Sequence, residues 1–390
     1  MKRTLTNDER LARARAIVAL SDASTQATLT IDLSAIAANW KKLSDVTGQA
    51  ECGAVVKADA YGTGIEFVVP VLERAGCRTF FVAHVSEGKR VRDRLRDKSA
   101  RIFVLNGVLP KRETVELMLI HRLIPVIGSL PEWRFWRDIP EAAGFPVALH
   151  VDTGMNRLGL DARDVPVLAQ DDSFRKALSL LIGHFVSSEA ADDPLNARQI
   201  AAFEAARAAF PQTPASLANS SGIFLPARPH YALARAGYGL YGGNPTPDQP
   251  NPMRPVVTLE APIIQLRDVE AGATVGYNGR WTARRPTRLA AIGLGYADGL
   301  MRSANGIDEK PDGGFAILAG ARCPFVGRVS MDLTVIDVTD APPGAVVPGA
   351  LMQILGPDIG VDDLAARAGT IGYEVLTNLG RRYNRVYIGD

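Results

Sequence analysis

AVVKADAYGTG, residues 54–64, places a lysine at the end of an apolar run, followed by a tyrosine and two glycines. The apolar residues 53–56 predict a buried strand, and the Tyr-Gly-Thr-Gly segment predicts a turn into a helix. Lys57 would then project from the carboxyl end of a strand, where α/β barrels carry their reacting groups. Apolar surroundings disfavour a charged amine, and a neutral amine can condense with an aldehyde. The alternative is a structural lysine whose side chain extends to water.

Short β-branched runs alternate with amphipathic segments from about residue 28 to residue 240. Repeated strand–helix units favour a parallel sheet, and eight of them would close a (β/α)8 TIM-type barrel. A doubly wound open sheet is the competing interpretation, but the turn after residues 28–32 lacks a glycine-rich phosphate loop. Ser34 is the expected N-cap of the helix after that first strand. The expected strands are 28–32, 53–57, 80–83, 101–105, 124–127, 147–152 and 180–185, and helical patterns include 86–95 and 194–210.

A linker rich in proline, asparagine and glycine, residues 242–252, separates this region from a second one. We therefore expect an N-terminal extension at 1–24, a barrel at 25–250 and a mainly β C-terminal domain at 251–390. Thr6 and Glu9 predict a capping box that opens a charged helix in the extension. The strand-like runs of the C-terminal domain are 256–266, 288–294, 315–319, 333–338 and 351–355, with one short helix at 361–368.

The composition of the 390-residue chain is that of an ordinary globular protein with a formal net charge of +2. So small a charge gives no reason to expect nucleic acid or an anionic membrane as a partner. The three cysteines are far apart and suggest neither a disulfide framework nor a zinc site. Charged residues interrupt any secretion signal, and no apolar run is long enough to span a membrane. We expect a cytoplasmic protein with reduced thiols.

Residues 237–242, GYGLYG, match the G-x-G-x-x-G pattern of a dinucleotide-binding loop. The match runs into the proline-rich linker instead of opening a helix, and no acidic residue follows at a suitable distance. A glycine-rich turn whose backbone N–H groups face a phosphate fits better. Barrels often bind phosphate in the loops after their seventh and eighth strands.

The chain resembles the alanine racemases in an ordered series of blocks that spans roughly residues 26–388. The blocks are VVKADAYG (55–62), HVDTGMNRLG (150–159), GHF (183–185), ANS (218–220), RAGYGLYG (235–242), VGY (275–277), GYADG (295–299), GRVSMD (327–332) and IGYE (371–374). The resemblance implies a pyridoxal 5'-phosphate enzyme that interconverts L-alanine and D-alanine, for peptidoglycan or for alanine catabolism. It also implies a barrel followed by a β domain, and a head-to-tail homodimer with active sites shared between subunits. That architecture agrees with the one predicted from periodicity.

Two catalytic residues are implied by the resemblance. Lys57 resembles the lysine that forms a Schiff base with the cofactor; once the substrate amine displaces it, its free amine can serve as a base. Racemisation needs a second base on the opposite face, because a single base would return the proton where it came from. Tyr277 resembles that second base, donated from the other subunit. A phenol acts so only where positive charge or hydrogen bonds favour the phenolate, and a structural strand tyrosine is the alternative.

Arg235 resembles the arginine that faces the pyridine nitrogen of the cofactor. Because arginine stays protonated, the ring nitrogen would remain unprotonated, which limits reprotonation at the cofactor carbon and hence transamination. His184 resembles the histidine beside the cofactor ring; a satisfied core histidine is the alternative. The residues that resemble the phosphate-binding set are Tyr61, Ser220, Gly237, Tyr238 and Tyr373, and Asn219 would orient its neighbours.

Arg157 resembles the arginine that contacts the phenolic oxygen of the cofactor and the substrate carboxylate. The backbone N–H of Met331 resembles the second carboxylate contact. Many family members carry a carbamylated lysine where this chain has His150, so carbamylation at this position is excluded. Either a neutral imidazole nitrogen or a bound anion would take its place.

Two other functions are compatible with a pyridoxal-phosphate barrel. An amino-acid decarboxylase resembles this architecture but uses a carboxylate at the pyridine nitrogen and a cysteine in its second site. Arg235, and the lack of a cysteine near Tyr277, argue against it. A non-catalytic pyridoxal-phosphate carrier needs neither a second domain nor a second base. The racemase interpretation is therefore preferred.

Overall fold

The computed structural model describes residues 27–389, so the predicted extension at 1–24 and its capping box lie outside the described residues. The backbone divides into two compact units. One unit is Ile36–Arg254; the other combines the residues up to Ala35 with Pro255–Asp390.

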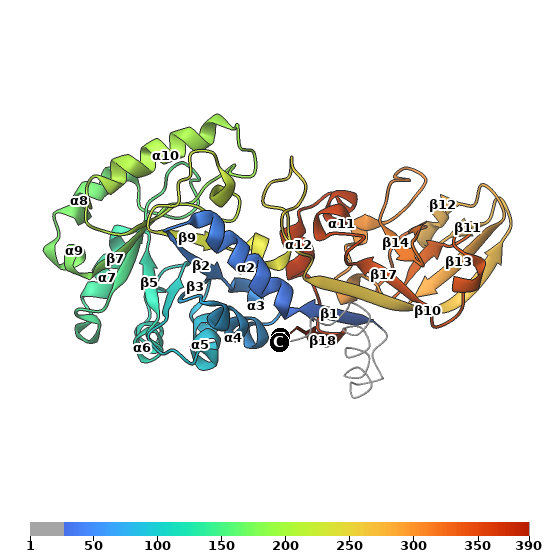
Figure 1. The fold of residues 1–390 in the computed structure, drawn as a ribbon, viewed down its shortest axis with the longest axis horizontal. Helices are drawn as coiled ribbons and strands as arrows, with labels where there is room; N and C mark the ends of the chain where they lie inside the picture. Colours follow the sequence, from blue (N-terminus) through green and yellow to red (C-terminus); the bar gives the residue numbers. More distant parts are fainter. Residues whose placement is uncertain (1–26, 390) are drawn as a thin grey trace, which may run out of the picture. The chain divides into compact units, whose positions relative to one another are not determined.

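The Ile36–Arg254 unit is a barrel of parallel strands, drawn from blue to yellow in Figure 1. Its eight-stranded sheet has the order β8-β7-β6-β5-β4-β3-β2-β9, and every neighbouring pair within this order is parallel. Backbone hydrogen bonds from Ala232 to Ala215 (3.0 Å) and from Arg235 to Ala218 (2.8 Å) close it between β8 and β9. The strands are β2 (Glu51–Val55), β3 (Thr79–Val82), β4 (Arg101–Val104), β5 (Ile124–Ile127), β6 (Val147–His150), β7 (Leu178–Ile182), β8 (Ala215–Ser216) and β9 (Leu233–Ala236). The predicted TIM-type fold is confirmed.

Helices cover the outside of this barrel. The helical segments of this part of the chain are α2 (Leu33–Thr47), α3 (Lys57–Tyr61), which is a short turn after β2, α4 (Ile65–Ala75), α5 (Val85–Arg94), α6 (Arg112–Ile120), α7 (Leu130–Arg137), α8 (Val165–Ala169), α9 (Asp172–Ala177) and α10 (Pro194–Arg207). Because the strands lie between the helices and the barrel interior, both of their faces are covered. Every residue of β3 and of β5 is accordingly buried. The stacked rings of Phe81 and Phe103, 5.1 Å apart, lie on neighbouring strands of this core.

The second unit is built mainly from β-strands, as predicted (Figure 1, orange to red, with the N-terminal strand in blue). Its long strand β10 (Val257–Val269) alternates buried and partly exposed residues in its first half, as expected of a sheet with one covered face. The other strands are β1 (Thr28–Asp32), β11 (Thr274–Val275), β12 (Trp281–Thr282), β13 (Thr287–Ile292), β14 (Phe315–Leu318), β15 (Ala321–Pro324), β16 (Thr334–Asp337), β17 (Leu351–Leu355) and β18 (Asn384–Ile388), and the helices are α11 (Val361–Ala368) and α12 (Gly372–Thr377).

Two expectations about the start of the fold are wrong. Strand β1 is not a barrel strand: it pairs antiparallel with β10 and parallel with β18, in the sheet of the second unit. The N-cap of α2 is Asp32, because its carboxylate accepts the Ala35 N–H at 3.0 Å and the Ser34 hydroxyl at 2.6 Å. Two real barrel strands, β8 and β9, were not identified, since β8 has two residues and β9 is short and alanine-rich.

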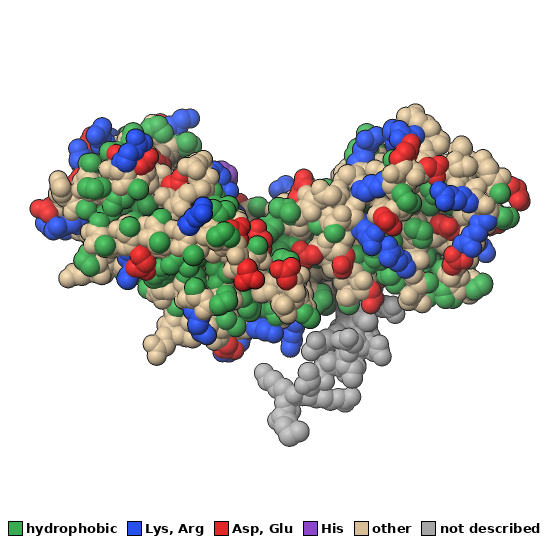
Figure 2. Space-filling model, turned by 90° about the horizontal axis from the view of Figure 1, so that it is seen from above, with side chains coloured by type: hydrophobic (Ala, Val, Ile, Leu, Met, Phe, Trp, Pro, Cys, Tyr) green, Lys and Arg blue, Asp and Glu red, His purple; other side chains and the backbone are tan. Residues whose placement is uncertain are grey.

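Charges of both signs are interspersed over the face shown in Figure 2, in keeping with the near-zero net charge. None of the helices in residues 27–389 combines the length and the apolar character needed to cross a lipid bilayer.

Candidate active site

Lys57 lies beyond the carboxyl end of strand β2, as predicted, separated from it by Val56, and begins the short turn α3. The next four residues, 58–61, have φ angles of 53°, 57°, 53° and 53°, in the left-handed region. None of them is glycine, and this conformation costs an L-residue roughly 1–2 kcal/mol. Such a turn persists only where the surrounding structure holds it, which marks it as a candidate functional element.

A cluster of basic side chains lies around Lys57. Burial, followed by the guanidinium of Arg157, lowers the pKa of the Lys57 amine; Arg235 lowers it further and the Glu87 carboxylate partly offsets the change. Burial and neighbouring positive charges also lower the pKa of His150 to about 4. Both imidazoles are neutral near pH 7, since the same causes hold the pKa of His184 well below its usual value. Such a cluster favours an anionic ligand.

Arg235 is buried, and its guanidinium donates only to neutral acceptors. Its partners include the carbonyl oxygens of Gly183 (2.7 Å) and Ser216 (2.9 Å) and the Ser216 hydroxyl (2.7 Å). Its terminal nitrogen also lies 3.3 Å from Nδ1 of His184. Within residues 27–389 it forms no ion pair, and burial alone lowers its pKa to about 10. The group is therefore a protonated cation at neutral pH, and no carboxylate of the described part of the chain pairs with it.

Two turns at the carboxyl ends of β8 and β9 meet at Ser220. Its buried hydroxyl accepts the backbone N–H of Gly237 at 2.9 Å and of Gly239 at 3.2 Å. The hydroxyl proton of Ser220 makes no hydrogen bond within residues 27–389 and so remains available to an acceptor. Asn219 accepts the Ser188 hydroxyl and the Gly222 N–H, both at 2.8 Å, which fixes this turn. These are the loops after the seventh and eighth barrel strands.

Tyrosines pack tightly around the same turns. The rings of Tyr61 and Tyr241 stack with centroids 4.6 Å apart, and the Tyr241 hydroxyl donates to the Val55 carbonyl at 2.9 Å. A Cβ at Gly237 would lie 2.9 Å from the Tyr61 hydroxyl oxygen. A side chain at position 237 would therefore have to displace the Tyr61 hydroxyl.

Arg157 lies on a loop that follows β6. The Asp152 carboxylate organises the loop by accepting the N–H groups of Gly154, Met155 and Asn156, each at 2.9 Å. Arg157 itself is exposed and forms no hydrogen bond or ion pair with residues 27–389. Its guanidinium is thus available to an anionic ligand.

Three predicted site residues, Tyr277, Met331 and Tyr373, belong to the second unit. Their exposed fractions are 68%, 54% and 37%, high for large apolar or aromatic side chains. Tyr277 begins a short turn between β11 and β12, immediately after Gly276, whose φ is 77°. A Cβ at Gly276 would lie 3.4 Å from the backbone nitrogen of Arg328. The Tyr277 turn is therefore next to the segment that carries Met331.

A third block of this unit joins the Met331 segment. The N–H of Tyr296 donates to the Ser330 carbonyl at 3.0 Å, and the N–H of Ala297 donates to the Met331 carbonyl at 2.9 Å. The structure thus gathers sequence blocks around 277, 296 and 331 within one region of the second unit. Tyr296, 40% exposed, adds a further accessible tyrosine to this region.

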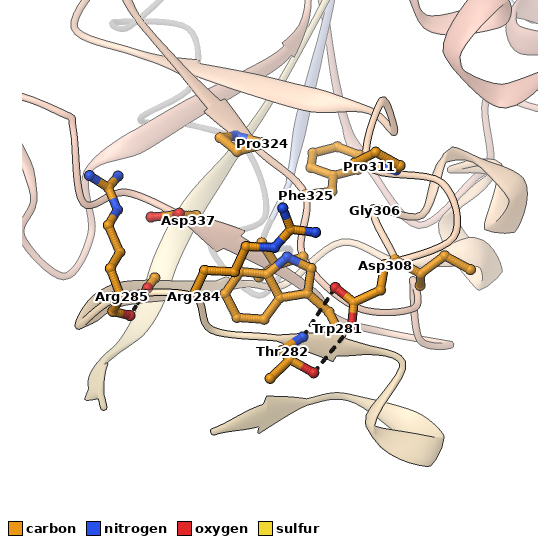
Figure 3. Close-up of a pocket in the computed structure, with 13 residues that line it drawn as sticks. Trp281, Thr282, Arg284, Arg285, Gly306, Asp308, Pro311, Pro324, Phe325 and Asp337 are labelled. Carbon is orange, nitrogen blue, oxygen red and sulfur yellow. Dashed lines mark hydrogen bonds between the residues drawn. The ribbon is translucent and has the colours of Figure 1, made fainter. Parts of the chain in front are cut away.

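A separate pocket of about 330 Å³ in the second unit contains none of the predicted site residues. Figure 3 shows the Trp281 ring with Arg284 beside it, and Asp308 accepting hydrogen bonds from Thr282. Trp281 and Thr282 form strand β12, so the pocket and Tyr277 share one hairpin.

Sequence reasoning missed three residues that organise the barrel part of the site. Glu87 accepts the Ala58 N–H at 2.6 Å, directly after Lys57. Gln199 of α10 donates to the His184 carbonyl at 2.9 Å and to the Thr153 hydroxyl at 3.0 Å. Tyr241, which stacks on Tyr61, is the third. The only available signal was an acidic residue in the first turn of a helix after a barrel strand, for Glu87.

Comparison with known families gives matches to both parts of the chain. The model of the alanine racemase N-terminal domain matches residues 31–245. The model of the alanine racemase C-terminal domain matches residues 256–387.

Individual relatives agree with these matches. An alanine racemase of Methylobacterium sp. (strain 4-46) is 53% identical over 365 residues, which are 93% of this chain and 98% of the relative. A catabolic alanine racemase of Agrobacterium fabrum is 44% identical and covers 92% of both chains. The crystal structure of alanine racemase from Bartonella henselae with covalently bound pyridoxal phosphate has a TM-score of 0.86 at 36% identity, over 93% of this chain and 99% of that one.

Proposed function

Because the chain belongs to the alanine racemase family, we propose that Lys57 and Tyr277 are the two bases with which it interconverts L-alanine and D-alanine. The enzyme depends on pyridoxal 5'-phosphate. Bound to the substrate amine, this cofactor withdraws electrons and makes the proton on the α-carbon removable. D-alanine so formed can supply peptidoglycan, and the reverse reaction can serve alanine catabolism.

The residues of the barrel fit this cofactor. The Ser220 hydroxyl, which accepts the N–H groups of Gly237 and Gly239, has no acceptor for its own proton within residues 27–389 and can donate it to a phosphate. Buried Arg235 lacks a carboxylate partner within residues 27–389, so a pyridine nitrogen can accept its hydrogen bond. The lowered pKa of Lys57 increases the fraction of neutral amine, the form that condenses with an aldehyde. We assign Tyr61, Tyr238 and Tyr373 to the phosphate side, with Asn219 as a positioning residue.

Proton transfer is assigned to the two bases on opposite faces of the α-carbon. The Lys57 amine removes the proton from one face, and the Tyr277 phenol returns a proton to the other. Arg157 and the backbone N–H of Met331 would bind the substrate carboxylate and hold the α-carbon between them. His184 supports Arg235, whose nitrogen lies 3.3 Å from it, and neutral His150 replaces the charge-bearing group of many relatives.

Arg235 is the residue that favours racemisation over side reactions. As a permanent cation it does not give a proton to the ring nitrogen, so proton return at the substrate carbon is preferred. The absence of a carboxylate partner of Arg235 within residues 27–389 also argues against the decarboxylase alternative. A non-catalytic pyridoxal-phosphate carrier would need only the barrel, and so does not account for the family match over both units.

We further propose a homodimer in which Tyr277 of one subunit completes the site of the other. The observation that supports it is the 68% exposure of the Tyr277 side chain in the isolated chain. Residence in the cytoplasm is also proposed, because Cys52, Cys77 and Cys323 are all buried free thiols.

Deuterium exchange at the α-carbon tests the two-base assignment. Lys57→Ala should abolish covalent cofactor attachment and racemisation. Tyr277→Phe should lower the racemisation rate by roughly 10²–10⁴-fold while one enantiomer of alanine still exchanges in deuterated water. Tyr231→Phe, at the start of β9 and therefore at the opposite end of the barrel, serves as control. Equal exchange of both enantiomers by Tyr277→Phe would remove Tyr277 from the mechanism.

A further inference from the structure

The strained turn after Lys57 is held from outside by helix α5. Glu87 and Arg90 of this helix are three residues apart and so share one face. Glu87 contacts Ala58, and Arg90 contacts Asp59. We propose that Glu87 and Arg90 are positioning residues that fix the Lys57 amine by holding residues 58–61 in the left-handed conformation.

Glu87 joins the carboxyl ends of two neighbouring barrel strands. One oxygen of its carboxylate accepts the Ala58 N–H at 2.6 Å, beyond the end of β2. The other accepts the N–H groups of Ala83 at 2.9 Å and His84 at 3.2 Å, beyond the end of β3. The residue that follows Lys57 is therefore tied to the adjacent strand through one side chain, by charge-assisted hydrogen bonds.

Arg90 ties the middle of the turn to the next helix. Its guanidinium donates to Asp59 at 2.5 Å and makes a bidentate pair with Glu66 of α4, with both distances 2.7 Å. Asp59 also accepts the Ile65 N–H, the first of α4, at 3.1 Å. Since Asp59 and Glu66 lie on either side of the two glycines 62 and 64, Arg90 closes this segment into a loop.

The two positioning residues differ in their electrostatic effect on Lys57. The Glu87 carboxylate raises the pKa of the Lys57 amine against the guanidinium groups of Arg157 and Arg235, whereas Arg90 pairs with Asp59 and Glu66. Removing the Glu87 charge should therefore favour the neutral amine. Removing Arg90 should disturb only the geometry. This difference separates a positioning role from general destabilisation.

The readout uses cofactor-free full-length protein, in which acetic anhydride labels neutral amines and mass spectrometry follows the Lys57 peptide against pH. Glu87→Gln should move the labelling midpoint to lower pH, and Arg90→Ala should leave it at that of the parent protein. In the holoenzyme, both variants should lower kcat roughly tenfold, with KM for alanine nearly unchanged, because the amine is misplaced. Arg90→Lys should recover part of kcat, since an ammonium can still pair with Asp59.

Arg94→Ala is the matched control, because it removes an exposed cation from the same helix without touching the turn. The proposal is overturned if Glu87→Gln leaves the labelling midpoint unchanged, or if Arg94→Ala lowers kcat as much as Arg90→Ala. If Glu87→Gln does not fold, the proposal is tested by the kcat of Arg90→Ala and its partial recovery in Arg90→Lys. The inference rests on the role proposed for Lys57. If Lys57→Ala still attaches the cofactor covalently, that role fails, but the labelling experiment still reports how Glu87 and Arg90 affect the Lys57 amine.

Discussion

Gly243 lies directly against the ring of a residue assigned to the phosphate side of the site. A Cβ there would lie 2.1 Å from the ring of Tyr238, which is itself buried. Gly243→Ala should displace that ring, destabilise the fold by about 1–3 kcal/mol and weaken cofactor binding. Urea denaturation and cofactor titration by absorbance measure both effects.

Gly344→Ala is the control, since no heavy atom lies within 4 Å of the Cβ it would add. Its effect on the free energy of unfolding should stay below about 0.5 kcal/mol. Equal effects of the two substitutions would mean that Tyr238 is not confined as described.

His150 gives the protein a specific acid sensitivity. Because burial lowers its pKa from 6.5 to about 4, the unfolded chain binds a proton between these pH values that the folded chain does not. Stability should therefore rise with pH through this window and the contribution should be complete above pH 6.5. His150→Asn should reduce the slope of unfolding free energy by up to about 1.4 kcal/mol per pH unit.

Denaturation at several pH values measures that slope, with His121→Asn as the comparison variant. His184, whose pKa is shifted the same way, should leave a residual slope in His150→Asn. An unchanged slope in His150→Asn would show that its imidazole takes up protons in the native protein over the same pH range as in the unfolded chain. That result would favour a bound anion beside His150 over a neutral nitrogen.

At the scale of elements, strand β1 links the start of the described chain to its end. Leu29 on this strand is fully buried, between β10 and β18. Leu29→Ala should cost about 2–5 kcal/mol and speed hydrogen exchange in β10 and β18, but not in the barrel strands. Leu351→Ala on β17, where the side chain is 49% exposed, should do neither. Faster hydrogen exchange in β2 or β3 instead would indicate that β1 packs with the barrel strands.

The elements also show where sequence patterns succeed. Apolar runs predicted the barrel strands β3 to β7 closely, and β17 and α11 to the residue, because burial and turn residues there agree with local propensity. Strand β8 failed because two residues carry no periodicity. The partners of β1 could not be predicted, since an alternating strand can pair in any sheet with a covered face.

The sequence predicted a set of candidate site residues but not the residues that support them in the structure. Motif blocks named the side chains at the carboxyl ends of the strands, because such ends meet at one rim of a barrel. The left-handed turn at residues 58–61 left no sign in the sequence, since none of these residues is glycine. Glu87 stands in an ordinary helix start, and only three-dimensional structure shows that it holds the residue after Lys57.

At the scale of the whole molecule, the proposal requires two copies of the chain for one active site. Tyr277 belongs to one compact unit and Lys57 to the other, and the exposure of Tyr277 leaves it available to a partner. A subunit with Lys57→Ala still offers an intact phenol, and a subunit with Tyr277→Phe still offers an intact amine. A mixed dimer would therefore contain one complete pair of bases.

Complementation between these two variants tests the central claim most directly. Purified Lys57→Ala and Tyr277→Phe proteins are measured for alanine racemisation separately, and again after they are mixed and allowed to exchange subunits. We predict that activity, nearly absent in each, returns on mixing and rises with the extent of exchange. If mixed dimers form, shown by native mass spectrometry, and no activity returns, then the two bases do not meet across subunits and the proposed mechanism is contradicted.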